Sequence, residues 1–405
     1  MTSTIYQQKI YLVVQGTSCN DIMKIIHKES NESNTNINNL SLSSNDRFSK
    51  LDEIGMKEMF LVRKSPDNQT VLGIKDTSTI YPKILTSLDV AAIESAFILY
   101  YNQTENIQIS PIPYLTNQSG VSNIRSFDEL KEVFESGNTS KYWNKRNLST
   151  NLDTNINSLK TKVPRIDWRL CSNDIQFQEK NIGARLKRVN KKTSKSQFQS
   201  FRFTSFQKDI LYPLISENIS LTPFESNTEL YNQSRGKKLK PMVMIVNFDT
   251  VKNFLNEIPK KRYKEGVTKI ERGSVWEIEM KIIENIQGNR IKYDYFYLNS
   301  TKKYPTELNQ TDLTFDKVSR DYSFRYKNKK YKLFMANETI PMDTLIQYEC
   351  KFCRYENQMR EALKKIYEKK YPNRKINNNI NKNVKRKNIT NKANSFENIV
   401  KTLVE

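Results

Sequence analysis

The sequence predicts an α/β fold of three layers, with a mostly parallel sheet, an antiparallel edge, a helical C-terminal extension and a basic tail. Short apolar, β-branched runs alternate with segments of helical spacing through roughly the first 300 residues, as in a sheet whose parallel strands are joined by helices. Two strand-like runs then follow each other around Gly288, which is typical of an antiparallel hairpin at a sheet edge. Beyond about residue 303 this alternation stops.

The predicted strands are apolar runs that end at turn residues. The first covers residues 9–14 and is followed by Gln15 and Gly16, and the most strongly apolar one covers residues 241–248. The remaining strands are expected at residues 83–88, 107–112, 276–282 and 291–297.

The predicted helices have apolar residues at helical spacing and begin at capping residues. Asp89 caps an Ala-rich helix over residues 90–101, and Asp249 with Thr250 caps a helix over 251–258. A short helix over 206–212 is expected to begin at Ser205 and to end at Pro213. Further helices are expected at residues 22–27, 51–62, 126–135 and 344–371.

The chain divides into three predicted parts. Residues 1–302 form the α/β domain, with polar insertions near 29–45 and 136–204. Residues 303–371 form a C-terminal extension with a long helix, and residues 372–405 form a basic, Asn-rich tail whose composition is typical of disorder.

The composition excludes several classes of protein. The chain has 405 residues, a formal net charge of +22 and a single histidine, so chemistry that needs two histidines is excluded. No run approaches the ~18 apolar residues of a membrane span, and we expect no secretory signal. Four cysteines are too few for a disulfide framework, which fits a reducing compartment. We therefore expect an intracellular protein without a membrane contact.

The abundance of Asn, which occurs 44 times, indicates an AT-rich genome such as that of an amoebal giant virus, an apicomplexan or a slime mould. A viral protein of this kind would lie in the host cytoplasm or in the virion.

Four segments carry a resemblance to a known family. They share the family's order of strand ends and helix starts. The segments are Leu12-Val13-Val14-Gln15-Gly16, Leu51-Asp52-Glu53-Ile54-Gly55, the stretch 85–96 with Ala91-Ala92-Ile93-Glu94-Ser95-Ala96, and the stretch 242–255; Gly273-Ser274-Val275-Trp276 adds a fifth, weaker match. Together they resemble the histidine phosphatase superfamily over roughly residues 8–298. The resemblance implies the phosphoglycerate-mutase-like fold.

The residues at the catalytic positions depart from the family pattern. The family uses a nucleophilic histidine, two phosphate-binding arginines, a second histidine and an acid. Its matching positions here hold Gln15, Val14, Ala91 (Val90 if the register shifts by one), Phe248 and Asn117, and Gly16 completes a degenerate pocket. A carboxamide cannot serve as the nucleophile, and apolar groups cannot replace guanidinium donors to a phosphate. We therefore expect an inactive phosphatase-like protein with no catalytic residue, no cofactor and no metal.

Basic residues are concentrated in two segments. Residues 180–208 hold nine and residues 374–393 hold seven, with no acidic residue in either, and phenylalanines are interleaved in the first. Such segments can bind nucleic acid without sequence preference or bind an acidic protein, and the alternative is a solvated loop in a Lys-rich protein. The candidate polyanion-binding residues are Arg185, Lys187, Arg188, Lys191, Lys192, Lys195, Lys385, Arg386 and Lys387.

Two further features have several interpretations. Cys350 and Cys353 form a Cys-x-x-Cys motif that can be two half-buried thiols, half of a zinc site completed by another chain, or a redox pair. His27 is expected to be an ordinary, partly exposed residue of a helix.

Three hypotheses for function remain open at this point. The first is an inactive phosphatase-like protein with a structural or binding role, such as a virion component in contact with nucleic acid or another polyanion. The second is a divergent phosphatase or phosphotransferase in which other residues fill the catalytic positions. The third is a plain nucleic-acid-binding protein.

Overall fold

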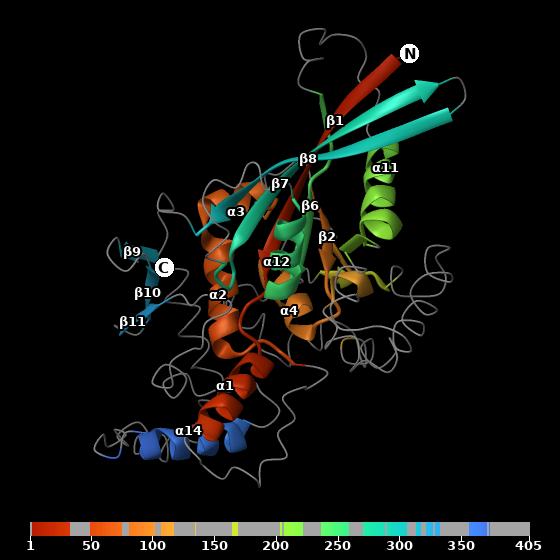
Figure 1. Cartoon of the computed structure of the whole chain (residues 1–405). Coiled ribbons are helices and arrows are strands. Elements are labelled where there is room, and N and C mark those ends of the chain that lie inside the picture. Colours follow the sequence, from red (N-terminus) through yellow and green to blue (C-terminus); the bar gives the residue numbers. More distant parts are fainter. Residues whose placement is uncertain are drawn as a thin grey trace, which may run out of the picture.

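The computed structural model of the chain has a mixed α/β fold built on one eight-stranded, mostly parallel sheet with helices on both faces (Figure 1). The structure describes residues 2–32, 49–74, 81–101, 107–116, 134, 164–168, 203–204, 206–221, 236–258, 270–287, 290–305, 313–316, 321–326, 329–332, 356–370 and 372.

The sheet has the strand order β4-β3-β2-β6-β1-β7-β8, with β5 pairing β1 beside β6. The strands are β1 (Thr2–Val14), β2 (Lys83–Thr86), β3 (Gln108–Pro111), β4 (Arg165–Ile166), β5 (Lys237–Lys238), β6 (Met242–Val246), β7 (Val275–Gln287) and β8 (Arg290–Tyr304). The pairs from β4 through β1 are parallel, whereas β7 runs antiparallel to both β1 and β8. The predicted mostly parallel sheet with an antiparallel edge is therefore confirmed.

The strand β1 is central, and its side chains alternate between two cores because successive residues of a strand point to opposite faces. Ile10, Leu12 and Val14 face one core, and Tyr11 and Val13 face the other. In the shared register Val14 lies beside Val246, and Ile245 lies beside Thr86. The carboxyl ends of β1, β6 and β2 are therefore level.

Helices cover both faces of the sheet. One core lies under α2 (Glu53–Lys64), α3 (Pro66–Val71) and α4 (Val90–Tyr100). The opposite core lies under α11 (Tyr212–Leu221), the π-helical turn η3 (Gln207–Leu211) before it, and α12 (Phe248–Glu257). Every residue of α4 is buried, Glu94 and Ser95 included, in keeping with its largely apolar composition.

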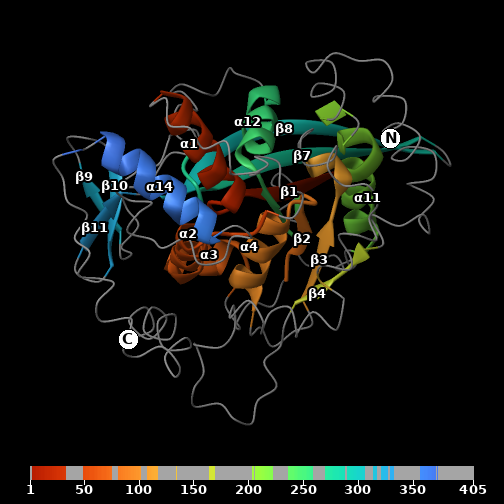
Figure 2. The same cartoon turned by 90° about the horizontal axis from the view of Figure 1, so that it is seen from below.

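The C-terminal part adds a small sheet that the sequence pattern does not reveal and a helix that lies within the predicted range 344–371. A three-stranded antiparallel sheet consists of β9 (Leu313–Asp316), β10 (Asp321–Tyr326) and β11 (Lys329–Lys332). The helix α14 (Glu356–Lys370) lies beside α1 (Cys19–Glu32), as Figure 2 shows, with Ala362 and Ile366 buried. The remainder of the predicted helix 344–371 and nearly all of the tail from 372 lie outside the described residues.

Three predicted boundaries are wrong. The helix predicted to start at 251 begins at Phe248, because Asn247 is the capping residue and accepts a hydrogen bond from the backbone N–H of Thr250. Pro213 does not end a helix; it is the second residue of α11, which follows the π-helical turn η3 (Gln207–Leu211) directly, and the helix continues through it to Leu221. The polar segment predicted as a loop from residue 29 continues the helix α1 to Glu32.

The predicted strands of the hairpin were also too short, and so was the first strand, which begins at Thr2 and not at residue 9. A small part of the predicted insertion 136–204 is a strand, β4, which pairs with β3. Within the described residues, no helix combines the length and apolar character needed to span a membrane.

Candidate functional site

The candidate site lies where the carboxyl ends of the parallel strands β1, β6 and β2 meet. The backbone N–H of Gln15 donates to the carbonyl of Val246 over 2.9 Å, and that of Ser87 donates to the carbonyl of Ile245 over 3.2 Å. The helices α4 and α12 begin at the same edge. Ligand crevices of open α/β sheets form at such edges, so this is the place where the predicted pocket residues should meet.

Gln15 stands directly after β1, with its side chain half-buried. Its Oε1 atom is buried and has no hydrogen-bond partner among the described residues. The neighbouring Gly16 donates its backbone N–H to Oγ of Ser95 in α4 over 3.3 Å, and that hydroxyl donates to the carbonyl of Ala91 over 2.7 Å. The structure thus brings Gln15, Gly16 and Ala91 into one neighbourhood, where Val14 is the last residue of β1.

Phe248 and Asn247 take different places at the end of β6. Phe248 is the first residue of α12 and packs against the core under α11 and α12, with Lys252 Nζ 6.0 Å from its ring centroid. Asn247 is the residue level with Gln15, since Val246 pairs with Val14. The polar side chain at this edge therefore belongs to Asn247, one residue before the predicted Phe248.

Asp89 supplies the charge at the centre of this edge. Its Oδ2 accepts hydrogen bonds from Oγ of Ser87 over 2.8 Å and from Nδ2 of Asn247 over 3.2 Å. Asp89 immediately precedes α4, and Asn247 immediately precedes α12. A carboxylate beside two helix N-termini is stabilised by the helix dipoles. The sequence marks Asp89 as a helix cap, but nothing in it indicates the contact with Asn247.

A second acidic group lies buried beneath the turn that follows β1. Glu58 of α2 accepts the backbone N–H of Thr17 over 2.7 Å and also the hydroxyl of Thr17. Burial raises the pKa of Glu58 to about 7, although the charge of Arg272 and the hydrogen bonds of Thr17 lower it, and Asp21 raises it further. This carboxyl group holds the turn between β1 and α1 in place.

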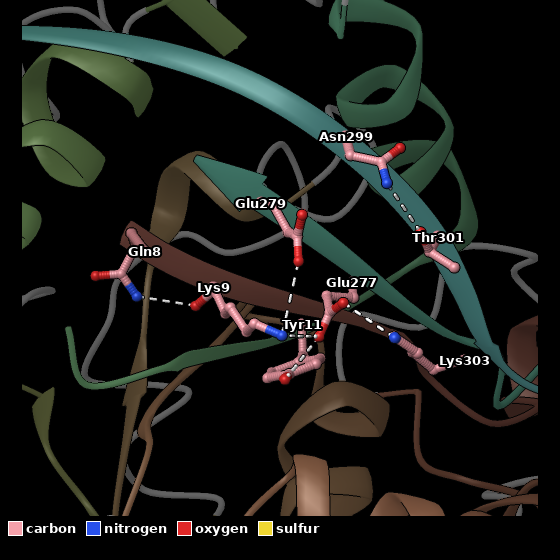
Figure 3. A network of polar contacts seen from close by, with 8 residues as sticks. All are labelled: Gln8, Lys9, Tyr11, Glu277, Glu279, Asn299, Thr301 and Lys303. Atoms are coloured by element: carbon pink, nitrogen blue, oxygen red, sulfur yellow. Dashed lines mark hydrogen bonds and ion pairs between the residues drawn. The ribbon is translucent and has the colours of Figure 1, made fainter. Parts of the chain in front are cut away.

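A polar network braces the antiparallel side of the sheet (Figure 3). Glu277 of β7 accepts hydrogen bonds from Lys9 over 3.0 Å and from the hydroxyl of Tyr11 over 2.9 Å, and it forms an ion pair with Lys303 over 3.0 Å. Burial alone would raise the pKa of Glu277, but these contacts outweigh burial and hold the pKa below its usual range. The network spans β1, β7 and β8, so its charges are satisfied within the sheet.

The other candidate residues lie apart from this edge or outside the described residues. Asn117 and all nine candidate polyanion-binding residues lie outside them, as do Cys350 and Cys353. The neighbour of Asn117, Thr116, is buried and accepts the backbone N–H of Leu88 at its hydroxyl over 2.7 Å. Within the described part of the chain, no group of three His, Cys, Asp or Glu side chains is placed to hold a metal ion.

Two residues of α1, Cys19 and His27, were considered in the sequence analysis for their chemistry. Cys19 is disulfide-bonded, and the other three cysteines all lie outside the described residues. His27 is partly buried in the third turn of the helix, as expected. At 1.5 Å per residue, about 12 Å of helix separates it from the first residue of α1.

Comparisons with models of protein families, with curated proteins and with solved structures found no match to this chain.

Proposed function

We propose that this chain is a catalytically inactive, phosphatase-like protein with a binding or structural role. The observation that carries the proposal is the hydrogen-bonded carboxylate of Asp89 between Ser87 and Asn247, next to the N-termini of α4 and α12. Helix N-termini at a sheet edge are natural anion sites. Here a carboxylate of the chain takes that position, so an entering phosphate would be repelled by a like charge.

The absence of a histidine nucleophile supports the same proposal. Gln15 stands at the position where the resembled family has its nucleophile, and a carboxamide does not form a phospho-enzyme. His27, the single histidine of the chain, lies along α1 and away from the start of that helix.

The topology supports the finer part of the proposal, a phosphoglycerate-mutase-like scaffold. The central strand β1 is parallel to β6 and antiparallel to β7. Three of the four motif segments meet at one sheet edge, with Gln15, Ser87 and Asn247 at the ends of their strands. The fourth segment supplies Gly55, in the first turn of α2, which contacts the turn after β1.

The test of inactivity is an aryl phosphate assay on the whole chain. We expect no turnover above the buffer rate at any pH between 5 and 9, and the same rate in the Gln15→Ala variant. Turnover by the unaltered protein that disappears in Gln15→Ala would contradict the proposal and favour a divergent phosphatase.

The charge of the chain supports a polyanion, most simply nucleic acid, as the partner. Residues 180–208 and 374–393 carry sixteen of the basic residues and no acidic one. Binding through such segments is independent of sequence, and log K falls by ~0.7–0.9 per neutralised phosphate for each tenfold rise in salt.

The partner is tested with random duplex and single-stranded DNA at two salt concentrations. The test variant lacks residues 372–405 and has Lys187, Lys191, Lys192 and Lys195 changed to Gln. The control has Lys238, Lys252, Lys364 and Lys365, which are exposed, changed to Gln. We expect the test variant to lose most of its affinity and salt dependence and the control to keep both. Equal affinity in both variants, or no binding by the unaltered chain at low salt, would leave an acidic protein as the better partner.

A further inference from the structure

The strand β8 is an edge of the main sheet. Its only partner among the described strands is β7, and the strand order ends with it. The outer ends of β1, β7 and β8 project past the rest of the molecule at the upper right of Figure 1. Every second residue of an edge strand turns its backbone N–H and C=O away from its neighbour, which makes such an edge a template for another strand.

The outer part of β8 is regular from Arg290 to Tyr297. Met280 pairs with Tyr297 and Glu279 with Asn299, so the strand has an irregularity at Leu298. A bulge of this kind twists a strand and limits pairing beyond it. The segment available to a partner is therefore the one from Arg290 to Tyr297.

One face of this segment is held firmly. The ring of Tyr295 stacks on Tyr212 of α11 with centroids 3.9 Å apart, and the hydroxyl of Tyr293 donates to Glu284 over 3.1 Å. The opposite face carries Lys292, Asp294 and Phe296, and Phe296 is 47% exposed. Ile291, at 58% exposure, is the most exposed large apolar side chain of the strand. The strand is thus fixed in shape, while Ile291 and Phe296 are exposed and no described strand pairs with its outer edge.

The order of charges makes the segment complementary to itself. If two copies of β8 run antiparallel with Tyr293 opposite its own copy, Lys292 of each stands opposite Asp294 of the other. In an antiparallel pair, residues directly opposite each other point to the same face of the sheet. The two-fold centre of the pairing must therefore lie on a residue, and the alternative registers are centred on the residues next to Tyr293. Centring on Asp294 opposes two carboxylates, and centring on Lys292 opposes two ammonium groups. Only the register centred on Tyr293 pairs both charges favourably.

We propose that a second copy of this chain pairs with β8 in that register, which gives a two-fold dimer whose sheet is continuous across both copies. The arrangement is isologous, as in most homodimers, because the same surface of each copy forms the contact. In it Ile291 of one copy stands opposite Tyr295 of the other, and Arg290 of one copy stands opposite the ring of Phe296 of the other. The self-complementary charges favour a second copy over an unrelated strand. The contact is short, so the dimer is weak, with a dissociation constant of roughly 1–100 µM.

The test is sedimentation velocity of the full chain from 1 to 200 µM at physiological salt, where charges more than about 8 Å apart are screened. Lys292→Glu alone and Asp294→Lys alone each oppose like charges and should weaken the dimer at least tenfold. An equimolar mixture of the two single variants restores both pairs, so it should form a heterodimer near the unaltered affinity. The double variant Lys292→Glu/Asp294→Lys should also dimerise.

The control is Lys252→Glu on α12, which makes the same charge change away from β8 and should leave the dimer unchanged. Thermal melts establish that each variant is folded, because Asp294 also pairs with Lys292 and Asn285 within one copy. A monomer at every concentration overturns the proposal. So does a dimer that both single variants retain, or a mixture of single variants that remains monomeric.

Discussion

Gly16 and Gly55 lie backbone against backbone, at the point where the turn after β1 meets the first turn of α2. A Cβ atom on Gly16 would lie 2.4 Å from the carbonyl oxygen of Gly55, and one on Gly55 would lie 2.1 Å from the carbonyl oxygen of Thr17. Real Cβ contacts are never this short, and the neighbouring atoms are backbone, so they cannot swing aside. Both residues come from segments on which the proposed phosphatase-like scaffold rests, and their contact positions the loop that carries Gln15.

Replacing Gly55 by Ala should lower the free energy of unfolding by about 3 kcal/mol or more, because overpacking against backbone forces α2 away from the sheet. Urea unfolding followed by circular dichroism measures the loss. Thr70→Ala, an exposed change in α3, is the control and should cost less than about 1 kcal/mol. A Gly55→Ala variant as stable as the unaltered chain would contradict the close contact.

Glu58 should make the protein less stable as pH rises from about 4.5 to 7. Over that range the unfolded state loses its proton, whereas the folded state, with a pKa of about 7, keeps it. Stability then falls by about 3 kcal/mol through the window and is flat above it. Glu58→Gln keeps an acceptor for Thr17 and removes this slope.

The measurement is the free energy of unfolding at pH 5 and at pH 8 for the unaltered chain, Glu58→Gln and Glu217→Gln. Glu217 is an exposed carboxylate of α11, so its variant should retain the slope. The same slope in all three proteins would show that another group titrates.

Glu277 should contribute stability that disappears in acid. Its folded pKa lies below the ordinary value of 4.5, so the contribution is present above that pH and is lost as pH falls through the folded pKa. Glu277→Gln should lower the free energy of unfolding by about 1–2 kcal/mol at pH 7, a modest loss because Lys9 and Lys303 remain partly solvated.

The matched control for Glu277→Gln is Glu279→Gln, which makes the same chemical change two residues further along β7, on the same face of the sheet. Glu279 is 40% exposed and 3.7 Å from Lys9, so its loss should have little effect at pH 7. The difference between Glu277→Gln and the unaltered chain should shrink below about pH 4. An equal loss in both variants would argue against a special role for the buried carboxylate.

Restoring the nucleophile should not restore phosphatase chemistry. The variant Gln15→His lacks guanidinium donors at positions 14 and 91 and retains the carboxylate of Asp89, and groups that act together cannot be rescued one at a time. We expect no phosphoryl adduct at position 15 by mass spectrometry after incubation with acetyl phosphate, either in Gln15→His or in Gln15→His/Asp89→Asn. A stable adduct in the single variant would show that the site still accepts phosphate.

The helices and strands that the sequence predicts best are those with a uniform apolar composition and a sharp boundary. The helix α4 is apolar except for Glu94 and Ser95 and begins after Asp89, and β6 is apolar between Pro241 and Asn247, so both were located within two residues. The antiparallel strands β7 and β8 were predicted too short. The missed part of β7, residues 283–287, mixes polar and apolar side chains on a partly solvated strand. The missed part of β8, residues 298–304, consists mostly of Asn, Ser, Thr and Lys, so neither part has a strong apolar signal.

The candidate site was predicted as a location, but not as a set of contacts. Strand ends indicate the edge where Gln15 and Ala91 lie, because parallel strands align their carboxyl ends. The hydrogen bond from Asn247 to Asp89 joins residues 158 positions apart, and it depends on the register between β2 and β6. An error of one residue in that register places Phe248 instead of Asn247 at the end of β6. The site is then predicted to have an apolar side chain where the structure has a polar one.

The central place of β1 has a consequence for how the chain is made. The ribosome makes this strand well before its partners β6 and β7, which comprise Met242–Val246 and Val275–Gln287. At 5–20 residues per second, about 10–50 s pass before either partner is complete. For that time an apolar strand has no native neighbour, and such long-range pairing is slow to nucleate. We therefore expect residues 10–14 of the nascent chain to bind chaperones that shield apolar segments until β6 and β7 have been made.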